Sequence, residues 1–135
     1  MMVRGGWTWC QFLGYPVLLA AAREDNPGPT YLLTDLTTLG LSSLGHGEPF
    51  DAIVCAGNVI TFVASGAEAE TLRSLRRHLV ADGICVIGFQ TERMDVADFD
   101  RHVAEAGFVL EQRFATWDLR PWHVDADFVV SFLRT

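Results

Sequence analysis

Residues 50–58 read FDAIVCAGN, an apolar run that ends abruptly in an alanine, a glycine and an asparagine. A near-continuous apolar run of this length is typical of a strand covered on both faces, as in a parallel sheet. In open parallel sheets, ligands bind outside the carboxyl ends of the strands. The stretch therefore predicts a buried strand over residues 50–56 and a loop behind it that faces a ligand.

Downstream of this strand, the pattern predicts a helix and then a second buried strand. Residues 66–83 place Leu72, Leu75 and Leu79 on one helical face, and we expect Gly83 to end the helix. Residues 84–89, ICVIGF, follow as another apolar run. Strand, helix and strand in this order are typical of a parallel pair joined by a crossover.

The flanking segments extend the same layered pattern. Upstream, residues 16–25 predict a helix, and residues 30–35 predict a short strand that ends at Asp35. Downstream, we expect a helix over 95–107 and strands over 108–117 and 127–135. The link between these last two strands is too short for a helical crossover, so they should be antiparallel.

This order of elements predicts one domain over residues 1–135, with an atypical amino-terminal segment at 1–15. Its 135 residues are enough to bury a single core. Strands that alternate with helices predict an α/β sheet with helices on both faces, and the closing hairpin predicts one reversed strand.

Composition excludes several classes of function. The net charge is −7 and all ten basic residues are Arg, so nucleic acid is not expected as a partner. No apolar stretch has the length of a membrane span and no signal-peptide pattern opens the chain, which favours a cytoplasmic location. Cys10, Cys55 and Cys85 lack metal-site spacing, so no metal is expected, and the last two are predicted core residues.

Five stretches of the chain form one further pattern: YLLTDLTTL, FDAIVCAGNVITFV, LRRHLVADGICVIGF, FDRHVAEAGFVLEQRFATWD and DFVVSFLRT. Together they resemble the carboxyl-terminal portion of class I S-adenosylmethionine-dependent methyltransferases, from about residue 16 to residue 135. The resemblance implies a Rossmann-like methyltransferase sheet, mostly parallel, with a carboxyl-terminal antiparallel hairpin. It also implies S-adenosylmethionine as cofactor and a small-molecule methyl acceptor.

The resemblance also assigns cofactor contacts. Asp35 would accept a hydrogen bond from the adenine amino group, with the Leu36 backbone N–H facing a ring nitrogen. Ala56, Gly57 and Asn58 would present backbone and a polar side chain to cofactor and substrate. The alternatives are local: Asp35 as a turn or cap residue, and Asn58 as a turn residue.

The final loop, WDLRPWHVD at residues 117–125, supplies candidates for a substrate pocket. Trp117, Trp122 and His123 would open on the same edge of the sheet, and a Trp face attracts a sulfonium cation. The alternative is that these aromatic residues only cover the end of the sheet. No catalytic residue is assigned, because methyl transfer depends mainly on holding the reactants in line.

The amino-terminal half of the family pattern is missing. The resemblance requires a glycine-rich G-x-G loop after the first strand, yet no such motif occurs ahead of residue 45. It also requires an acid for the ribose hydroxyls, at a position that falls near Leu13, whose side chain cannot accept such a bond. We therefore expect a sheet truncated at the amino terminus, and an isolated chain that binds the cofactor weakly or not at all.

Two functions remain open. The first is a methyltransferase that is truncated or completed by another chain, and the second is a non-catalytic binding or assembly module that retains the fold. In either case the edge of the strand at 50–55 would lack its usual neighbour. We expect a homodimer, a partner chain, or residues 7–13 to cover that edge.

The codons of Trp7–Cys10 suggest one origin for the missing half. Read one nucleotide earlier, WTWC encodes an aliphatic residue or Met, then Asp, then an aliphatic residue or Met, then Val. The family carries a similar stretch near the end of its second strand. The hypothesis is therefore a frame change or a misassigned start near residues 10–15, with truncation and evolved loss as the alternatives.

Overall fold

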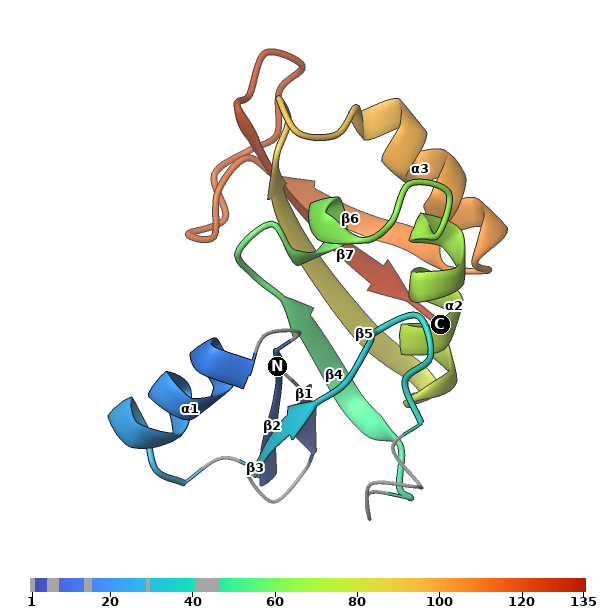
Figure 1. Ribbon diagram of the computed structural model, residues 1–135. Helices are drawn as coiled ribbons and strands as arrows, with labels where there is room; N and C mark the ends of the chain where they lie inside the picture. The colour runs from blue at the N-terminus through green and yellow to red at the C-terminus, as the bar shows by residue number, and fades with distance from the viewer. Residues whose placement is uncertain (1, 5–7, 14–15, 29, 41–46) are drawn as a thin grey trace.

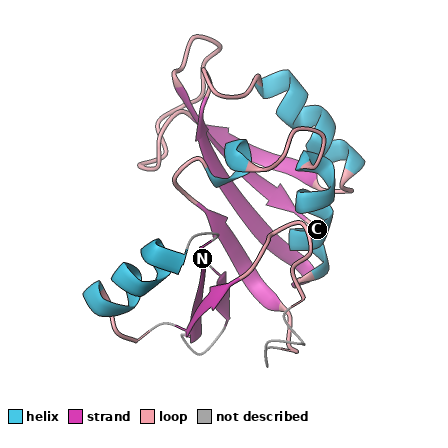
Figure 2. Ribbon diagram, viewed as in Figure 1, coloured by secondary structure: helices cyan, strands magenta, loops and turns pink. Residues whose placement is uncertain are grey.

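The computed structural model describes residues 2–4, 8–13, 16–28, 30–40 and 47–135. They form a seven-stranded sheet with helices packed on it (Figures 1 and 2). The strand order is β3-β2-β1-β4-β5-β7-β6. The strands are β1 (Met2–Arg4), β2 (Thr8–Leu13), β3 (Thr30–Leu33), β4 (Phe50–Cys55), β5 (Leu79–Gln90), β6 (Val109–Phe114) and β7 (Phe128–Arg134). The helices are α1 (Pro16–Asp25), the short 3-10 helix η2 (Val59–Phe62), α2 (Glu68–Arg77) and α3 (Val96–Glu105).

The strand directions confirm a mostly parallel α/β sheet. β2 is parallel to β3, and β4 is parallel to β5. α1 links β2 to β3 and α2 links β4 to β5, in opposite directions across the sheet. Right-handed crossovers in opposite directions place their helices on opposite faces. The helices therefore cover both faces, as the order of elements predicts.

The carboxyl-terminal hairpin is also confirmed. β7 is antiparallel to both β5 and β6, so it lies between them as a reversed strand.

Helix α3 begins with a side-chain cap. Asp95 accepts hydrogen bonds from the backbone N–H groups of Ala97 and Asp98. These bonds satisfy donors that a helix leaves unpaired in its first turn.

The predicted helix over residues 66–83 is too long. α2 ends at Arg77, and the chain enters β5 at Leu79, which pairs with Phe50. The Phe50 N–H also donates to the His78 carbonyl at 2.8 Å. Leu79 is buried, as the helical pattern requires, but pairing with β4 buries it as a strand residue. Sheet pairing therefore replaces the last turns of the predicted helix.

The amino terminus contains two strands that the sequence did not predict. β1 runs antiparallel to β4, with Met2 opposite Ile53 and Val3 opposite Ala52. The sheet thus has two reversed strands, β1 and β7, and the expectation of one reversed strand is wrong. The segment on the edge of β4 is Met2–Arg4, whereas Thr8–Leu13 pairs with β1 and β3 farther out. Residue 7 lies outside the described residues.

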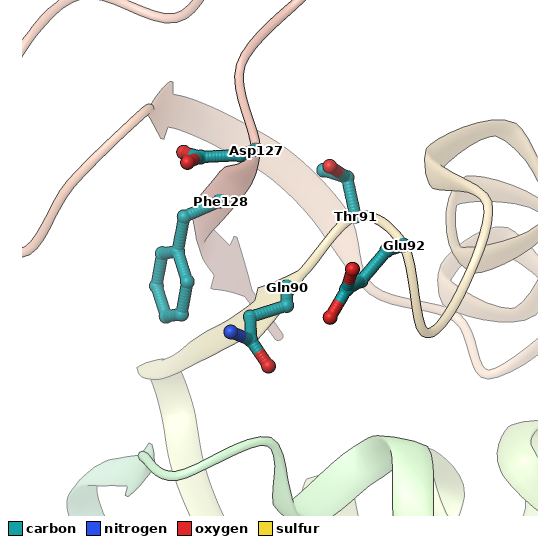
Figure 3. A pocket seen from close by; sticks show the side chains of 5 residues that line it. All are labelled: Gln90, Thr91, Glu92, Asp127 and Phe128. Carbon is teal, nitrogen blue, oxygen red and sulfur yellow. The ribbon is translucent and has the colours of Figure 1, made fainter.

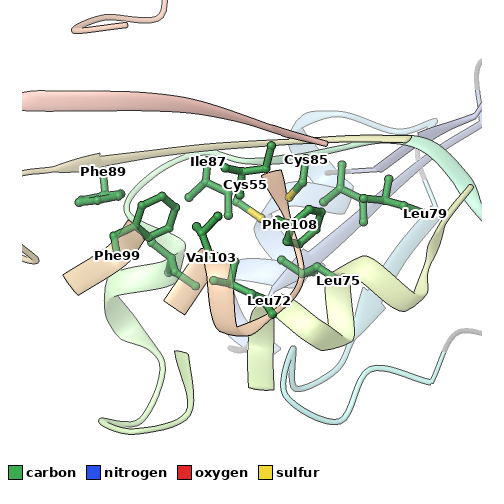
Figure 4. Packing of buried hydrophobic residues seen from close by; sticks show 14 of the residues in the cluster. Cys55, Leu72, Leu75, Leu79, Cys85, Ile87, Phe89, Phe99, Val103 and Phe108 are labelled. Carbon is green, nitrogen blue, oxygen red and sulfur yellow. The ribbon is translucent and has the colours of Figure 1, made fainter. Parts of the chain in front are cut away.

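The main hydrophobic core of the described residues lies between the sheet and the two helices α2 and α3 (Figure 4). Cys55 and Cys85 belong to it as free, buried thiols, which confirms their prediction as core residues. A hydrogen bond with the Cys55 thiol, together with burial, raises the pKa of Cys85 well above its ordinary value.

Within the described part of the chain, no helix is long and apolar enough to cross a membrane.

Candidate functional site

Five strands, β2 to β6, run in the same direction, so their carboxyl ends share one edge of the sheet. Asp35 lies shortly after β3 at this edge, and Asn58 lies shortly after β4. β2 and β1 separate β3 from β4 in the sheet. Three strand spacings amount to about 14 Å across the sheet. The two groups of predicted cofactor contacts therefore lie at the same edge but far apart along it.

Asp35 forms a local turn. Its Oδ1 accepts hydrogen bonds from the Thr37 N–H at 2.8 Å and from the Thr37 hydroxyl at 2.6 Å. These two bonds lower the pKa of the exposed Asp35 carboxyl, and the bond from the Thr37 hydroxyl lowers it most. Leu36 is half-buried against the core. The geometry is that of the turn alternative, and the adenine contact stays a prediction.

The loop after β4 is a turn with left-handed backbone at two successive residues. Ala56 and Gly57 are exposed, and both Gly57 (φ 74°) and Asn58 (φ 62°) have left-handed backbone conformations. Glycine adopts this conformation readily, and asparagine is enriched there among other residues. A Cβ atom at Gly57 would meet no atom within 4 Å. The loop therefore offers open backbone at the edge of the sheet.

The Asn58 side chain is bonded to Gln90 at the end of the neighbouring strand β5. Asn58 Oδ1 accepts from the Gln90 backbone N–H at 2.7 Å, and Asn58 Nδ2 donates to Gln90 Oε1 at 3.3 Å. Arg93 Nε also donates to Gln90 Oε1, at 2.7 Å, and the Arg93 guanidinium lies over the Phe62 ring. These contacts connect the loops that follow β4 and β5.

A hollow of about 290 Å³ opens beside Gln90, between the end of β5 and the start of β7 (Figure 3). Thr91 joins the two sides, because its N–H donates to the Asp127 carbonyl and its hydroxyl donates to the Ala126 carbonyl. The lining residues are Gln90, Thr91, Glu92, Asp127 and Phe128.

The aromatic candidates of the final loop do not gather in one pocket. Trp117 is partly exposed and lies over Gly88, whose position would place a Cβ atom 2.4 Å from the Trp117 ring. Gly88 faces away from the core that its neighbours Ile87 and Phe89 enter. Trp122 packs against that core and below the Arg113 guanidinium. The two Trp side chains thus lie on opposite faces of the sheet, while His123 is exposed.

Solved structures of other proteins share this geometry, although no model of a protein family and no curated protein matches the chain. A TehB-like SAM-dependent methyltransferase from Corynebacterium glutamicum superposes with a TM-score of 0.85 at 32% sequence identity. The match covers 93% of this chain and 67% of that one. This chain belongs to the class I S-adenosylmethionine-dependent methyltransferases.

More distant methyltransferase structures share the fold of this chain. The CcbJ methyltransferase from Streptomyces caelestis has a TM-score of 0.81 at 14% identity, over 93% of this chain and 74% of its own. CalS10, an amino pentose methyltransferase from Micromonospora echinaspora solved with SAM bound, has a TM-score of 0.73 at 16% identity. That match covers 95% of this chain and 74% of CalS10.

The described residues of this chain fit the cofactor only in part. Asp35, Leu36 and the loop at 56–58 lie at the correct edge of the sheet. The strand between β2 and β4 is β1, however, and it runs antiparallel to both, from Met2 opposite Ile53 toward the edge at which β4 begins. β1 thus runs opposite to β4, away from the edge at which Asn58 lies. At the end of β2, Leu13 supplies no acid.

Sequence reasoning missed Gln90, Arg93 and the acidic residues of the hollow. One signal was available in the sequence. Gln90 ends the strand that becomes β5, which is parallel to β4, so it lies beside the loop after β4. The described residues contain no group of three or more His, Cys, Asp or Glu side chains able to hold a metal ion.

Proposed function

We propose that this chain is an S-adenosylmethionine-dependent methyltransferase-like protein whose cofactor site is incomplete when the chain is isolated. The observation that supports this proposal is the direction of β1. In the family pattern, a strand beside β4 ends in a glycine-rich loop at the ligand-binding edge. Here the strand in that place ends at the opposite edge, at Arg4.

The remaining contacts favour recognition of the adenine side of the cofactor. Asp35 still has a second carboxylate oxygen outside the turn with Thr37, and Gly57 leaves open space for a ligand to approach. Without contacts to the ribose and to the methionine part, the cofactor would keep much of its rotational freedom. Binding would then lose the preorganisation that gives affinity.

Calorimetry on the purified chain tests this proposal. We expect S-adenosylmethionine and S-adenosylhomocysteine to give no saturable heat below millimolar concentration. The Corynebacterium glutamicum relative serves as positive control under the same conditions. Saturable micromolar binding to the isolated chain would contradict the proposal, and Asp35→Ala would then show whether the predicted adenine contact contributes.

The second candidate is a non-catalytic binding or assembly module. One observation favours it: the polar side chains predicted to face the cofactor, Asp35 and Asn58, already bond to Thr37 and Gln90. A module of this kind would not bind the cofactor under any condition. A truncated enzyme would gain cofactor binding when a chain that contains the glycine-rich half is added, so titration with and without such a chain distinguishes the two.

A further inference from the structure

The Gln90 side chain has a fixed orientation. Its Oε1 accepts from two donors, Asn58 Nδ2 and Arg93 Nε. Turning the amide by half a rotation would point its NH₂ group at these two N–H donors, which is unfavourable. The amide nitrogen therefore has to lie on the other side, and Figure 3 shows it on the side of Phe128.

This orientation presents N–H donors to the hollow. Gln90 lines the hollow, and its Nε2 donates to no group among the residues that the structure describes. A ligand atom with a lone pair, such as a hydroxyl oxygen, is the complement of these donors. The phenyl ring of Phe128 adds an apolar wall next to them.

The other walls of the hollow carry negative charge and hydrogen-bond acceptors. Glu92 and Asp127 line the hollow with exposed carboxylates, and neither belongs to an ion pair in the described part of the chain. The net charge of −7 adds a general attraction for cations. A hollow of about 290 Å³ is at the small end of ligand sites and suits a molecule of monosaccharide size.

We propose that this hollow binds a small polyhydroxylated amine. Gln90 donates to a hydroxyl oxygen of the ligand, and Glu92 and Asp127 face its ammonium group. In a methyltransferase this ligand would be the methyl acceptor, and that assignment alone rests on the proposed function. The binding site itself does not require the cofactor.

The test is a two-dimensional ¹⁵N–¹H NMR titration without cofactor. D-glucosamine, D-glucose and D-glucuronate share a ring and differ in charge, so they serve as matched probes. We expect shifts at residues 90–92 and 127–128, strongest for glucosamine, weaker for glucose and weakest for glucuronate. Equal shifts for the three sugars, shifts confined to other residues, or no shifts at all would overturn the proposal.

Two variants separate the donor from the carboxylates. Gln90→Glu keeps an oxygen for Arg93 and Asn58 but replaces the N–H donors by a second oxygen, so glucose binding should fall several-fold. Glu92→Gln combined with Asp127→Asn should raise the glucosamine Kd by about two- to fivefold and leave glucose unchanged. Glu105→Gln, at an exposed carboxylate of α3 outside the hollow, is the charge control and should have no effect.

If Glu105→Gln raised the glucosamine Kd as much as the double variant does, the effect would come from the overall charge of the protein. The assignment of Glu92 and Asp127 as ligand contacts would then be overturned. Unchanged glucose binding in Gln90→Glu would overturn the donor role of Gln90. Because no cofactor is present, these outcomes are independent of the calorimetry above. Failure of the proposed cofactor deficiency and failure of this binding site can therefore be told apart.

Discussion

At the scale of single residues, Gly88 shows how a missing side chain creates a contact. It lies in β5 on the face opposite the main core, and its lack of a Cβ lets the Trp117 ring lie against the strand. The Phe128 ring also approaches this position and would lie 3.2 Å from a Cβ atom there. The sequence predicted strand β5 but gave no reason for a glycine inside it.

Gly88→Ala should displace Trp117 and lower the free energy of unfolding by about 1–3 kcal/mol, the usual cost of overpacking. Denaturant titration measures the change. In a Trp117→Ala background the same substitution should cost less, because the closest clash is gone, and a double-mutant cycle gives the difference. An equal cost in both backgrounds would mean that the ring does not determine the effect.

Asp35 provides a prediction on pH. Its folded-state pKa is lowered by the hydrogen bonds from Thr37, so these bonds favour the ionised form. Their contribution to stability is present above the ordinary pKa of about 3.9 and is lost as the pH falls through the lowered value. Thr37→Val removes the hydroxyl, so the Asp35 pKa should rise toward its ordinary value in a carboxyl ¹³C titration. Thr38→Val should leave it unchanged.

At the scale of elements, the sequence predicted the existence of β3 to β7 and of all three α-helices, because apolar patterning determines them locally. It failed where partners distant in sequence decide. Leu79 fits a helix by its spacing to Leu72 and Leu75, yet pairing with Phe50 makes it a strand residue. β1 and β2 have no distinctive pattern and exist through their neighbours in the sheet.

The candidate site divides in the same way. The positions of Asp35 and Asn58 at the carboxyl edge follow from strand order, so the sequence predicted them. Their hydrogen-bond partners depend on side-chain geometry, and only the structure gives the contacts with Thr37 and Gln90. The separation of Trp117 from Trp122 depends on the face of the sheet against which each side chain packs. The loop sequence does not indicate this face.

Helix α2 offers a test of buried polarity. Thr71 is fully buried and its hydroxyl has no hydrogen-bond partner among the described residues. Thr71→Val should therefore raise the free energy of unfolding by about 1 kcal/mol, because an unpaired polar group is removed from the interior. Thr61→Val is the matched control: it deletes a hydroxyl that donates to the Asn58 carbonyl and should destabilise the fold. A loss of stability in Thr71→Val would mean that its hydroxyl has a partner, such as a buried water.

At the scale of the whole molecule, β1 joins two parts of the sheet. β2 and β3 with α1 lie on one side of it, and β4 to β7 with α2 and α3 lie on the other. Deleting residues 1–4 should leave the edge of β4 open, and open edges pair with other chains. We expect light scattering to show association of the deleted chain, with the full chain as control. A deleted chain that remains monomeric and folded would show that β1 is not needed to protect this edge.

The bond from the Gln90 N–H to Asn58 Oδ1 makes one backbone proton a reporter on the loop after β4. This proton exchanges with solvent only when the Asn58 carboxamide leaves it, so its exchange rate measures how often the loop opens. Asn58→Gly, which keeps the left-handed backbone without strain, should speed exchange at Gln90 while leaving the centre of β5 protected. A ligand that orders the loop would slow the same proton, so occupancy can be followed before any substrate is known.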